Sequence, residues 1–295
     1  MIFSTELDSL QRFLFEHASV RGEIIHLEQT YQTILSQHAY PPAVKHLLGE
    51  ALMSAALLAG NIQFEGNLSL QFHGDKRLPL LLVQCDHQLH LRALVKYDAS
   101  TADIDYNSAF LEGKMTLFID QYNQTQAYQS IVPIHSISMA DNLSHYFAQS
   151  DQISTRVWFF INQQQAAGML LQLMPDTNVL EREEFWNYAV KVGETITNHE
   201  LFTLDNKTIL HRLYHETELQ LYPARHISFR CQCNIDKMKQ VLTVLGKKDL
   251  QQLLKEKNEV SINCDFCNQR YVFNPIDVAR IFKNPITPEI WVEKI

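Results

Sequence analysis

Four of the five cysteines lie near the end of the 295-residue chain, as Cys231-Gln-Cys233 and, thirty residues later, Cys264-Asp-Phe-Cys267. Two thiol pairs that a hairpin brings together can supply the four tetrahedral thiolates that Zn²⁺ prefers, with Zn–S distances of about 2.3 Å. In a reducing compartment, metal binding explains this spacing better than permanent disulfides. The sequence therefore predicts one Zn²⁺ per chain, bound by Cys231, Cys233, Cys264 and Cys267.

Such a metal can serve three purposes. Structural zinc is the usual role of a closed four-ligand site, because a module of about 65 residues buries too little surface to be stable alone. Catalytic zinc is disfavoured, since four thiolates leave no open position for water or substrate. In a redox sensor, zinc keeps the sulfurs as thiolates, which oxidants attack. A Cys264–Cys267 disulfide then removes two ligands together with their contribution to folding.

Residues 230–295 contain the signals for a small zinc-binding domain. Asn234 is placed to cap a helix that continues to Gly246, and Asp249 is expected to begin a short second helix. The string VSINCDFCNQRYVF predicts a strand, a tight knuckle and a second strand, followed by a helix near 275–283.

Residues 1–176 predict an α+β core domain. The 42–59 segment has apolar residues at helical spacing and is apolar almost all round in its second half, so we expect a buried helix. Strands are expected near 68–72, 79–85, 89–95, 115–119, 127–132, 156–161 and 168–174. Short strands joined by hairpins, with helices on one face, give an α+β sheet domain.

Residues 177–229, between these domains, predict a helical linker with no clear strand. Its first amphipathic stretch carries Phe185, Trp186, Ala189, Val192 and Ile196, and its second carries Leu210, Leu213, Tyr214 and Leu219. Because this segment has too little apolar surface for a core of its own, we expect it to fold only by docking onto a neighbour.

The charge and the apolar runs of the sequence disfavour some classes of partner. The chain has 33 acidic and 25 basic residues and a formal charge of −8, so nucleic acid is not the expected partner. The 231–295 segment is nevertheless mildly basic, with ten basic and eight acidic residues. The apolar run 51–64 is too short to cross a bilayer, and the acidic start of the chain does not resemble a secretory signal. We therefore expect a cytoplasmic protein without a membrane partner.

The remaining reactive side chains have simpler interpretations. Cys85 ends an apolar run and is expected to be a small buried side chain. His211 and His215 stand four residues apart but lack the glutamate that a zincin helix requires, so a polar helix face explains them better. The sequence has no P-loop, no GxGxxG and no GxSxG elbow. We expect no enzymatic activity.

The segment from Ile227 to Phe282 around the four cysteines resembles the C-terminal zinc domain of the heat-shock protein 33 family of bacterial redox-regulated chaperones. The resemblance covers nearly the whole chain. It includes LGEALMSAALLAG at 48–60, YQSIVPI at 128–134, YFAQSDQIST at 146–155 and AAGMLLQLMPD at 166–176.

This resemblance implies an ATP-independent holdase that is inactive when reduced and zinc-bound. Oxidants would form the disulfides Cys231–Cys233 and Cys264–Cys267, zinc would leave and the linker would unfold. The protein would then form a homodimer and hold unfolding client proteins for ATP-dependent refolding chaperones. A zinc-ribbon-like nucleic-acid or protein adaptor with a permanent structural zinc is the alternative.

Overall fold

The computed structural model describes residues 7–16, 18–99, 109–110, 112–124, 126–136, 138–175 and 179–283. The contacts divide the chain into two compact units, Met1–Arg230 and Cys231–Ile295, which we call the body and the module. The predicted boundary between 176 and 177 lies outside the described residues, so the division of the body into core and linker stays a prediction.

The first sheet of the body is antiparallel and follows the order β10-β1-β2-β9-β8, with β11 also pairing with β1. Its strands are β1 (Asp8–Phe15), β2 (Val20–Leu27), β8 (Thr155–Ile161), β9 (Ala166–Leu173), β10 (Leu219–Leu221) and β11 (Arg225–His226). Strand β9 is buried at every position because both faces of this sheet are covered. Strands β1 and β2 are not among the strands predicted from the sequence.

The second sheet follows the order β12-β5-β4-β3-β6-β7. Its strands are β3 (Gly66–His73), β4 (Leu80–Asp86), β5 (His90–Lys96), β6 (Lys114–Gln121), β7 (Tyr128–Pro133) and β12 (Ser228–Phe229). All neighbours are antiparallel except β12, which pairs in parallel with β5. The strands expected in this part of the chain are present.

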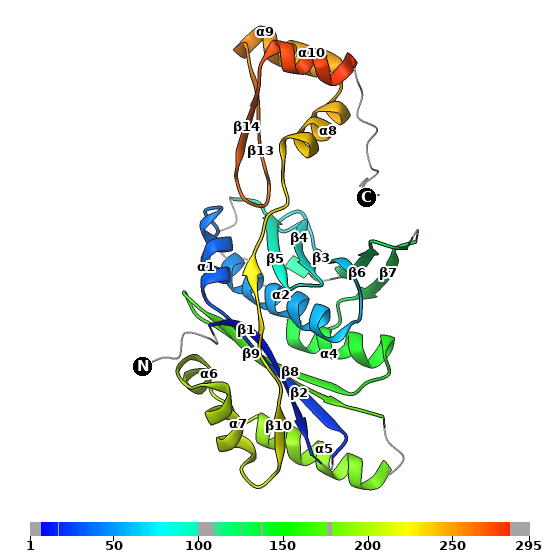
Figure 1. The fold of residues 1–295 in the computed structure, drawn as a ribbon, viewed down its shortest axis with the longest axis vertical. Coiled ribbons are helices and arrows are strands. Elements are labelled where there is room, and N and C mark those ends of the chain that lie inside the picture. The colour runs from blue at the N-terminus through cyan, green and yellow to red at the C-terminus, as the bar shows by residue number, and fades with distance from the viewer. Residues whose placement is uncertain are drawn as a thin grey trace. The chain divides into compact units, whose positions relative to one another are not determined.

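Helix α2 (Pro42–Asn61) lies between the two sheets and contacts strands of both (Figure 1). Its burial on all sides explains why its sequence is apolar almost all round. The predicted α+β class is confirmed. Helices were expected on one face of the strands, whereas the central helix α2 has a sheet on each side. By length and composition α2 is also long enough to cross a membrane, but it is a buried core helix here.

Two shorter helices complete this layer: α1 (Gln29–Ser36) and α4 (Met139–Ser150). Asp8 holds the start of α1, because its carboxylate accepts hydrogen bonds from the backbone N–H groups of Glu28, Gln29 and Thr30. Helix α4 contacts β8 and α2. Together with both sheets, these helices enclose the larger hydrophobic core.

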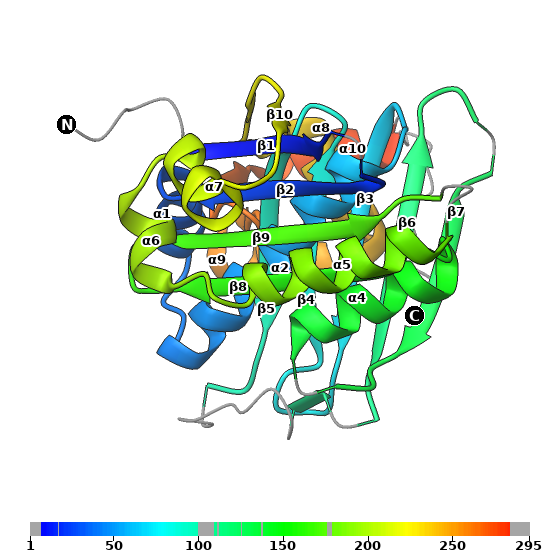
Figure 2. The same ribbon diagram turned by 90° about the horizontal axis from the view of Figure 1, so that it is seen from below.

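The other face of the first sheet is covered by α5 (Val179–Gly193), α6 (Asn198–Thr203) and α7 (Asn206–Tyr214) (Figure 2). Ala189 and Ile196 are buried against it, and Phe185, Trp186 and Val192 pack around them. The amphipathic stripe thus docks on the sheet as predicted. The expectation of no strand in this region was wrong, since β10, β11 and β12 follow α7 and pair with strands far away in the sequence.

The module contains three helices and one hairpin among its described residues. They are α8 (Ile235–Leu245), α9 (Lys247–Lys257), β13 (Val260–Asn263), β14 (Arg270–Phe273) and α10 (Pro275–Lys283). Gly246 joins α8 directly to α9 with a φ of 91°, which glycine adopts without strain. The second helix therefore begins two residues before Asp249. The hairpin and the helix at 275–283 are confirmed.

Candidate metal centre

The first cysteine pair lies in the segment that leads into α8. Its position is fixed by Asn234, whose side-chain oxygen accepts hydrogen bonds from the backbone N–H groups of Asp236 and Lys237 at 3.1 and 2.9 Å. This confirms the predicted helix cap, which satisfies N–H groups that have no partner within the helix. Cys233 therefore stands directly before a capped helix start.

The second pair lies in the tight turn between β13 and β14. The ladder ends with the pair Asn263 and Arg270. The turn is closed by two backbone hydrogen bonds: Cys264 N–H donates to the Gln269 carbonyl at 3.0 Å, and Asn268 N–H donates to the Cys264 carbonyl at 2.8 Å. Asn268 has a φ of 54°, a left-handed conformation that asparagine tolerates. The result is the predicted knuckle, with both thiols at its tip.

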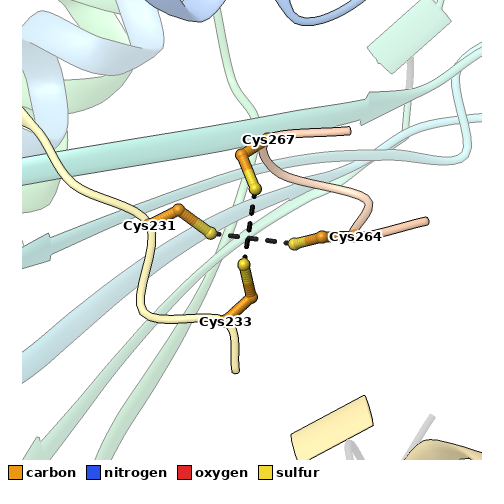
Figure 3. Close-up of side chains that lie close together, drawn as sticks. All are labelled: Cys231, Cys233, Cys264 and Cys267. Carbon is orange, nitrogen blue, oxygen red and sulfur yellow. Dashed lines mark hydrogen bonds between the residues drawn. The ribbon is translucent and has the colours of Figure 1, made fainter. Parts of the chain in front are cut away.

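The four sulfur atoms converge on one point (Figure 3). The Sγ atoms of Cys231 and Cys264 are 3.7 Å apart, those of Cys233 and Cys267 are 3.4 Å apart, and all four lie within 4.8 Å of one another. Sulfurs at tetrahedral Zn–S distances of about 2.3 Å are about 3.8 Å apart. The cluster thus has the size and donor type of a closed tetrahedral site for a soft or borderline divalent ion.

The cluster is partly shielded and supplied with hydrogen bonds. Cys264 is buried and the other three cysteines are half-buried. Backbone N–H groups donate to three of the sulfurs: Cys233 N–H to Cys231, Phe266 and Cys267 N–H to Cys264, and Gln269 N–H to Cys267. Such donors favour the thiolate form that a metal ligand requires.

Because the four sulfur atoms lie so close together, the protonated thiol form of each cysteine competes with its charged thiolate form. The hydrogen bond between Cys231 and Cys264 lowers the pKa of the Cys231 thiol and, together with burial, raises the pKa of Cys264 to about 12. Burial raises the pKa of Cys267 to about 11. Four thiolates in this space need a cation to balance them, and a divalent ion at the centre removes the competition. The donor set therefore fits a metal ion.

Sequence reasoning missed one further residue at this centre. The hydroxyl group of Tyr271, on β14, donates a hydrogen bond to the Cys233 sulfur at 3.2 Å, and this contact raises the pKa of the phenol to about 12. A tyrosine four residues after a CxxC pair was the available signal. Its partner, however, lies 38 residues earlier in the chain, so only the folded hairpin reveals the contact.

The other reactive side chains lie elsewhere. Cys85 is fully buried in β4, where burial raises the pKa of its thiol, so the interpretation as a small core residue holds. His211 and His215 are exposed at the end of α7, with ring centroids 6.3 Å apart. Among the described residues, metal-ligand side chains gather in groups of three or more only at the four cysteines.

A body of two sheets around a central helix, joined to a small module with four convergent cysteines, defines a two-unit protein whose C-terminal module has a cysteine cluster that could hold a metal ion. The model of the Hsp33 protein family matches residues 8–274. The chain therefore belongs to the Hsp33 family, a family of stress-response chaperones.

Curated relatives named 33 kDa chaperonin support this membership. The relative from Pseudomonas aeruginosa strain LESB58 is 41% identical over 281 residues, which cover 93% of this chain and 94% of the relative. That from Pseudomonas syringae pv. syringae strain B728a is 40% identical over 282 residues, or 94% of each chain. The fold matches a crystal structure of a 33 kDa chaperonin from Thermotoga maritima, with a TM-score of 0.78, 24% identity and coverage of 94% of this chain and 98% of that chain.

Proposed function

We propose that the protein is a redox-regulated, ATP-independent holdase in the cytoplasm, inactive while its module holds one Zn²⁺ and activated when oxidants remove it. The main support for this proposal is that four cysteine sulfurs converge within 4.8 Å of one another. They do so in a module that has only a small hydrophobic core among its described residues. A redox-sensitive ligand set that also holds the fold together links an oxidant to a structural change.

In the reduced state, Cys231, Cys233, Cys264 and Cys267 would hold the zinc ion, which keeps their sulfurs deprotonated and ties the segment before α8 to the hairpin knuckle. Seven buried residues from all three helices and both strands form the rest of the module core. Metal ligation in zinc-finger peptides contributes about 10–16 kcal/mol to folding. We infer that the module folds only with its metal.

Oxidation would form the disulfides Cys231–Cys233 and Cys264–Cys267. Each disulfide takes two electrons from one cysteine pair and leaves two sulfurs that no longer act as thiolate ligands. The family resemblance supports this pairing, and the short spacing within each pair keeps the partners adjacent after the cluster opens. The module would then lose both its metal and its fold.

The end of the body suggests how this change is passed on. Residues 225–230, which we call the strap, run from the first sheet to the second, since β11 pairs with β1 and β12 with β5. Ile227, between them, is fully buried in the larger core. The last hydrogen bond of the strap joins Arg230 N–H to the Leu91 carbonyl at 3.0 Å, and Cys231 is the next residue. Loss of order at Cys231 would therefore loosen the strap from its end.

Loosening the strap would weaken the helical layer that precedes it in the chain. Helices α5–α7 cover a second hydrophobic cluster on the first sheet, which includes Phe13, Phe15 and Met169. Release of this layer bares two apolar faces, and such surfaces bind the exposed apolar segments of unfolding proteins. The bared faces would also support the homodimer, and clients would pass from it to ATP-dependent refolding chaperones.

The test follows zinc and client aggregation together. The reduced, zinc-loaded protein is treated with hydrogen peroxide at mildly elevated temperature, zinc release is read with a chromogenic chelator, and light scattering reports the aggregation of a thermally unfolding client enzyme. We expect both zinc release and suppression of aggregation, and neither in the reduced sample. Cys85→Ala is the matched control and should respond like the natural chain.

Zinc release without suppression of aggregation contradicts the chaperone proposal. Binding of nucleic acid by the reduced protein with a steep salt dependence would instead support the adaptor function.

A further inference from the structure

Cys233 accepts a hydrogen bond from a side chain: the Tyr271 hydroxyl group donates to its sulfur at 3.2 Å. Backbone N–H groups of the module donate to Cys231, Cys264 and Cys267. A side-chain donor can be removed by substitution while the backbone stays the same, so this contact is an adjustable part of the centre.

Tyr271 is held firmly enough to aim its hydroxyl group. It pairs with Ile262 across the β13–β14 ladder. Its ring is partly buried against the module core, where Ile262 and Cys233 also pack. The hairpin that carries Cys264 and Cys267 thus also supplies the donor to Cys233. Because packing fixes the ring, the hydrogen bond costs little additional side-chain entropy.

A hydrogen bond to a thiolate lowers the reactivity of the sulfur. In oxidation by hydrogen peroxide, a thiolate lone pair attacks one peroxide oxygen, the O–O bond breaks, and hydroxide leaves as a sulfenic acid forms. A second thiolate then attacks that sulfur and expels another hydroxide, which leaves a disulfide. The Tyr271 proton withdraws charge from the lone pair that begins this sequence, and it stabilises the starting thiolate.

We propose that Tyr271 is a positioning residue that sets the oxidant threshold of the metal centre by restraining Cys233. It acts through the sulfur and does not itself react. The proposal deepens the redox switch and rests on the proposed function, because a threshold has meaning only where oxidation releases the metal.

The test is Tyr271→Phe, which keeps the ring in the core and removes only the hydroxyl group. At fixed peroxide concentration we expect zinc release to be roughly tenfold faster than in the natural chain, since hydrogen bonds to charged groups are among the stronger ones. We also expect zinc affinity to fall about 10- to 100-fold, as for other losses of a hydrogen bond to a metal ligand.

Two readouts separate this role from a general loosening of the module. In the Co²⁺-loaded protein, loss of the hydrogen bond should shift the sulfur-to-metal charge-transfer band to longer wavelength. In the zinc-loaded protein, alkylation by N-ethylmaleimide, mapped by mass spectrometry, should accelerate selectively at Cys233. The control is Val272→Thr, because Val272 is 46% exposed on the same strand, and it should leave both readouts unchanged.

Site-specific replacement of Tyr271 by 3-fluorotyrosine gives a second variant of nearly the same shape. Its more acidic hydroxyl group donates more strongly, so zinc release and Cys233 alkylation should be slower than in the natural chain. The 3-fluorotyrosine variant tests the role of Tyr271 even where the phenylalanine variant does not fold.

The two proposals fail in different ways. If the natural chain releases zinc under peroxide but the Tyr271 variants match it in rate, affinity and Cys233 alkylation, the role of Tyr271 is refuted and the switch stands. If the natural chain keeps its zinc under peroxide, the switch is refuted. Alkylation at Cys233 then still tests whether Tyr271 restrains this sulfur, and an unchanged rate overturns the proposal for Tyr271.

Discussion

The body and the module bury their apolar side chains to very different extents. In the body, two sheets and α2 enclose one large cluster, and α5–α7 enclose a second. Among its described residues, the module has seven buried core residues and seven exposed large apolar side chains: Ile235, Val241, Val244, Leu245, Leu253, Val272 and Ile276. The described part of the body, which is far longer, exposes four.

This difference shows where each unit obtains its stability. Burial of apolar surface is the main favourable contribution to folding, and small domains bury a smaller share of their surface. We therefore expect the body to fold without a metal, and we expect the module to depend on the additional bonds of its cysteine cluster. A chemical change at the four sulfurs should therefore unfold the module, and we expect the strap to pass this change to the body.

Removal of the metal from the reduced protein is the strongest test of this comparison. A chelator should unfold the module, because ligation supplies about 10–16 kcal/mol in comparable zinc-finger peptides. The larger core of the body should persist. NMR spectra should show loss of dispersed signals from 231–283 and their retention in β3–β6. A module that keeps its fold without metal would show that its small core is sufficient.

Ile227→Ala tests the strap. The side chain is 0% exposed in the larger core, and large-to-small substitutions at such positions cost about 2–5 kcal/mol. We expect hydrogen exchange in 219–230 to accelerate in the reduced, metal-loaded chain. The control is Ile131→Ala, at an exposed position of β7, where the change should be within about 0.5 kcal/mol. Equal protection of the strap in both variants argues against its role as the connection.

Asn206→Ala tests how the helical layer is attached. Asn206, the first residue of α7, is fully buried; its side-chain oxygen lies 2.8 Å from His26 Nε2, and its amide group donates to Gln11 Oε1 at 2.8 Å. Removing the amide leaves polar partners unsatisfied, at a cost of about 1–3 kcal/mol. Urea unfolding should show this loss, with Asn198→Ala, an exposed position of α6, as the control. A loss no larger than in the control would indicate that packing alone holds the layer.

The same contact predicts a smaller effect of pH. Burial lowers the pKa of His26 in the folded chain, so as the pH falls below about 6.5 the unfolded chain takes up the proton first. The free energy of unfolding should therefore decrease by at most about 1.4 kcal/mol per pH unit until the lowered pKa is reached. Glu50 has the opposite effect on the free energy of unfolding. Burial raises its pKa to about 7, so the folded chain takes up this proton first as the pH falls.

His26→Gln isolates the histidine, since it keeps a donor for Asn206 and does not titrate. The natural chain should lose stability relative to this variant as the pH falls from 7 to 5. Parallel stability profiles over this range would falsify the assignment to His26.

Cys85→Ala should have the smallest effect on thiol chemistry. The Cys85 thiol is fully buried and its pKa is raised, so it is not available as a thiolate. Titration of accessible thiols in the metal-free chain, whose body stays folded, should give the same number for the variant and the natural protein. A lower number for the variant would show that Cys85 belongs to the reactive set.

The module was the part of the fold most open to prediction from sequence. Its cap at Asn234, its knuckle and its last helix depend on signals within a few residues, and the cysteine spacing selects its chemistry. Tyr271 was missed because an O–H···S contact across 38 residues leaves no local pattern.

The body shows why the remaining strands were missed. In β2, Arg21, Gly22 and Glu23 interrupt the apolar alternation, yet Glu23 is buried and accepts hydrogen bonds from Arg12 at 2.9 Å and from Asn61 at 2.8 Å. These partners come from another strand and from the end of α2, so only the assembled fold makes the charge tolerable. Strands β10–β12 are two or three residues long, and their pairing with β1 and β5 is what defines them.

Ile227 precedes Cys231 by only four residues. A loss of order that passes along so short a stretch of backbone requires no complementary surfaces on the two units. We therefore expect related sequences to vary more at the exposed α8 positions of the module than at the positions around Ile227, which is buried in the larger core.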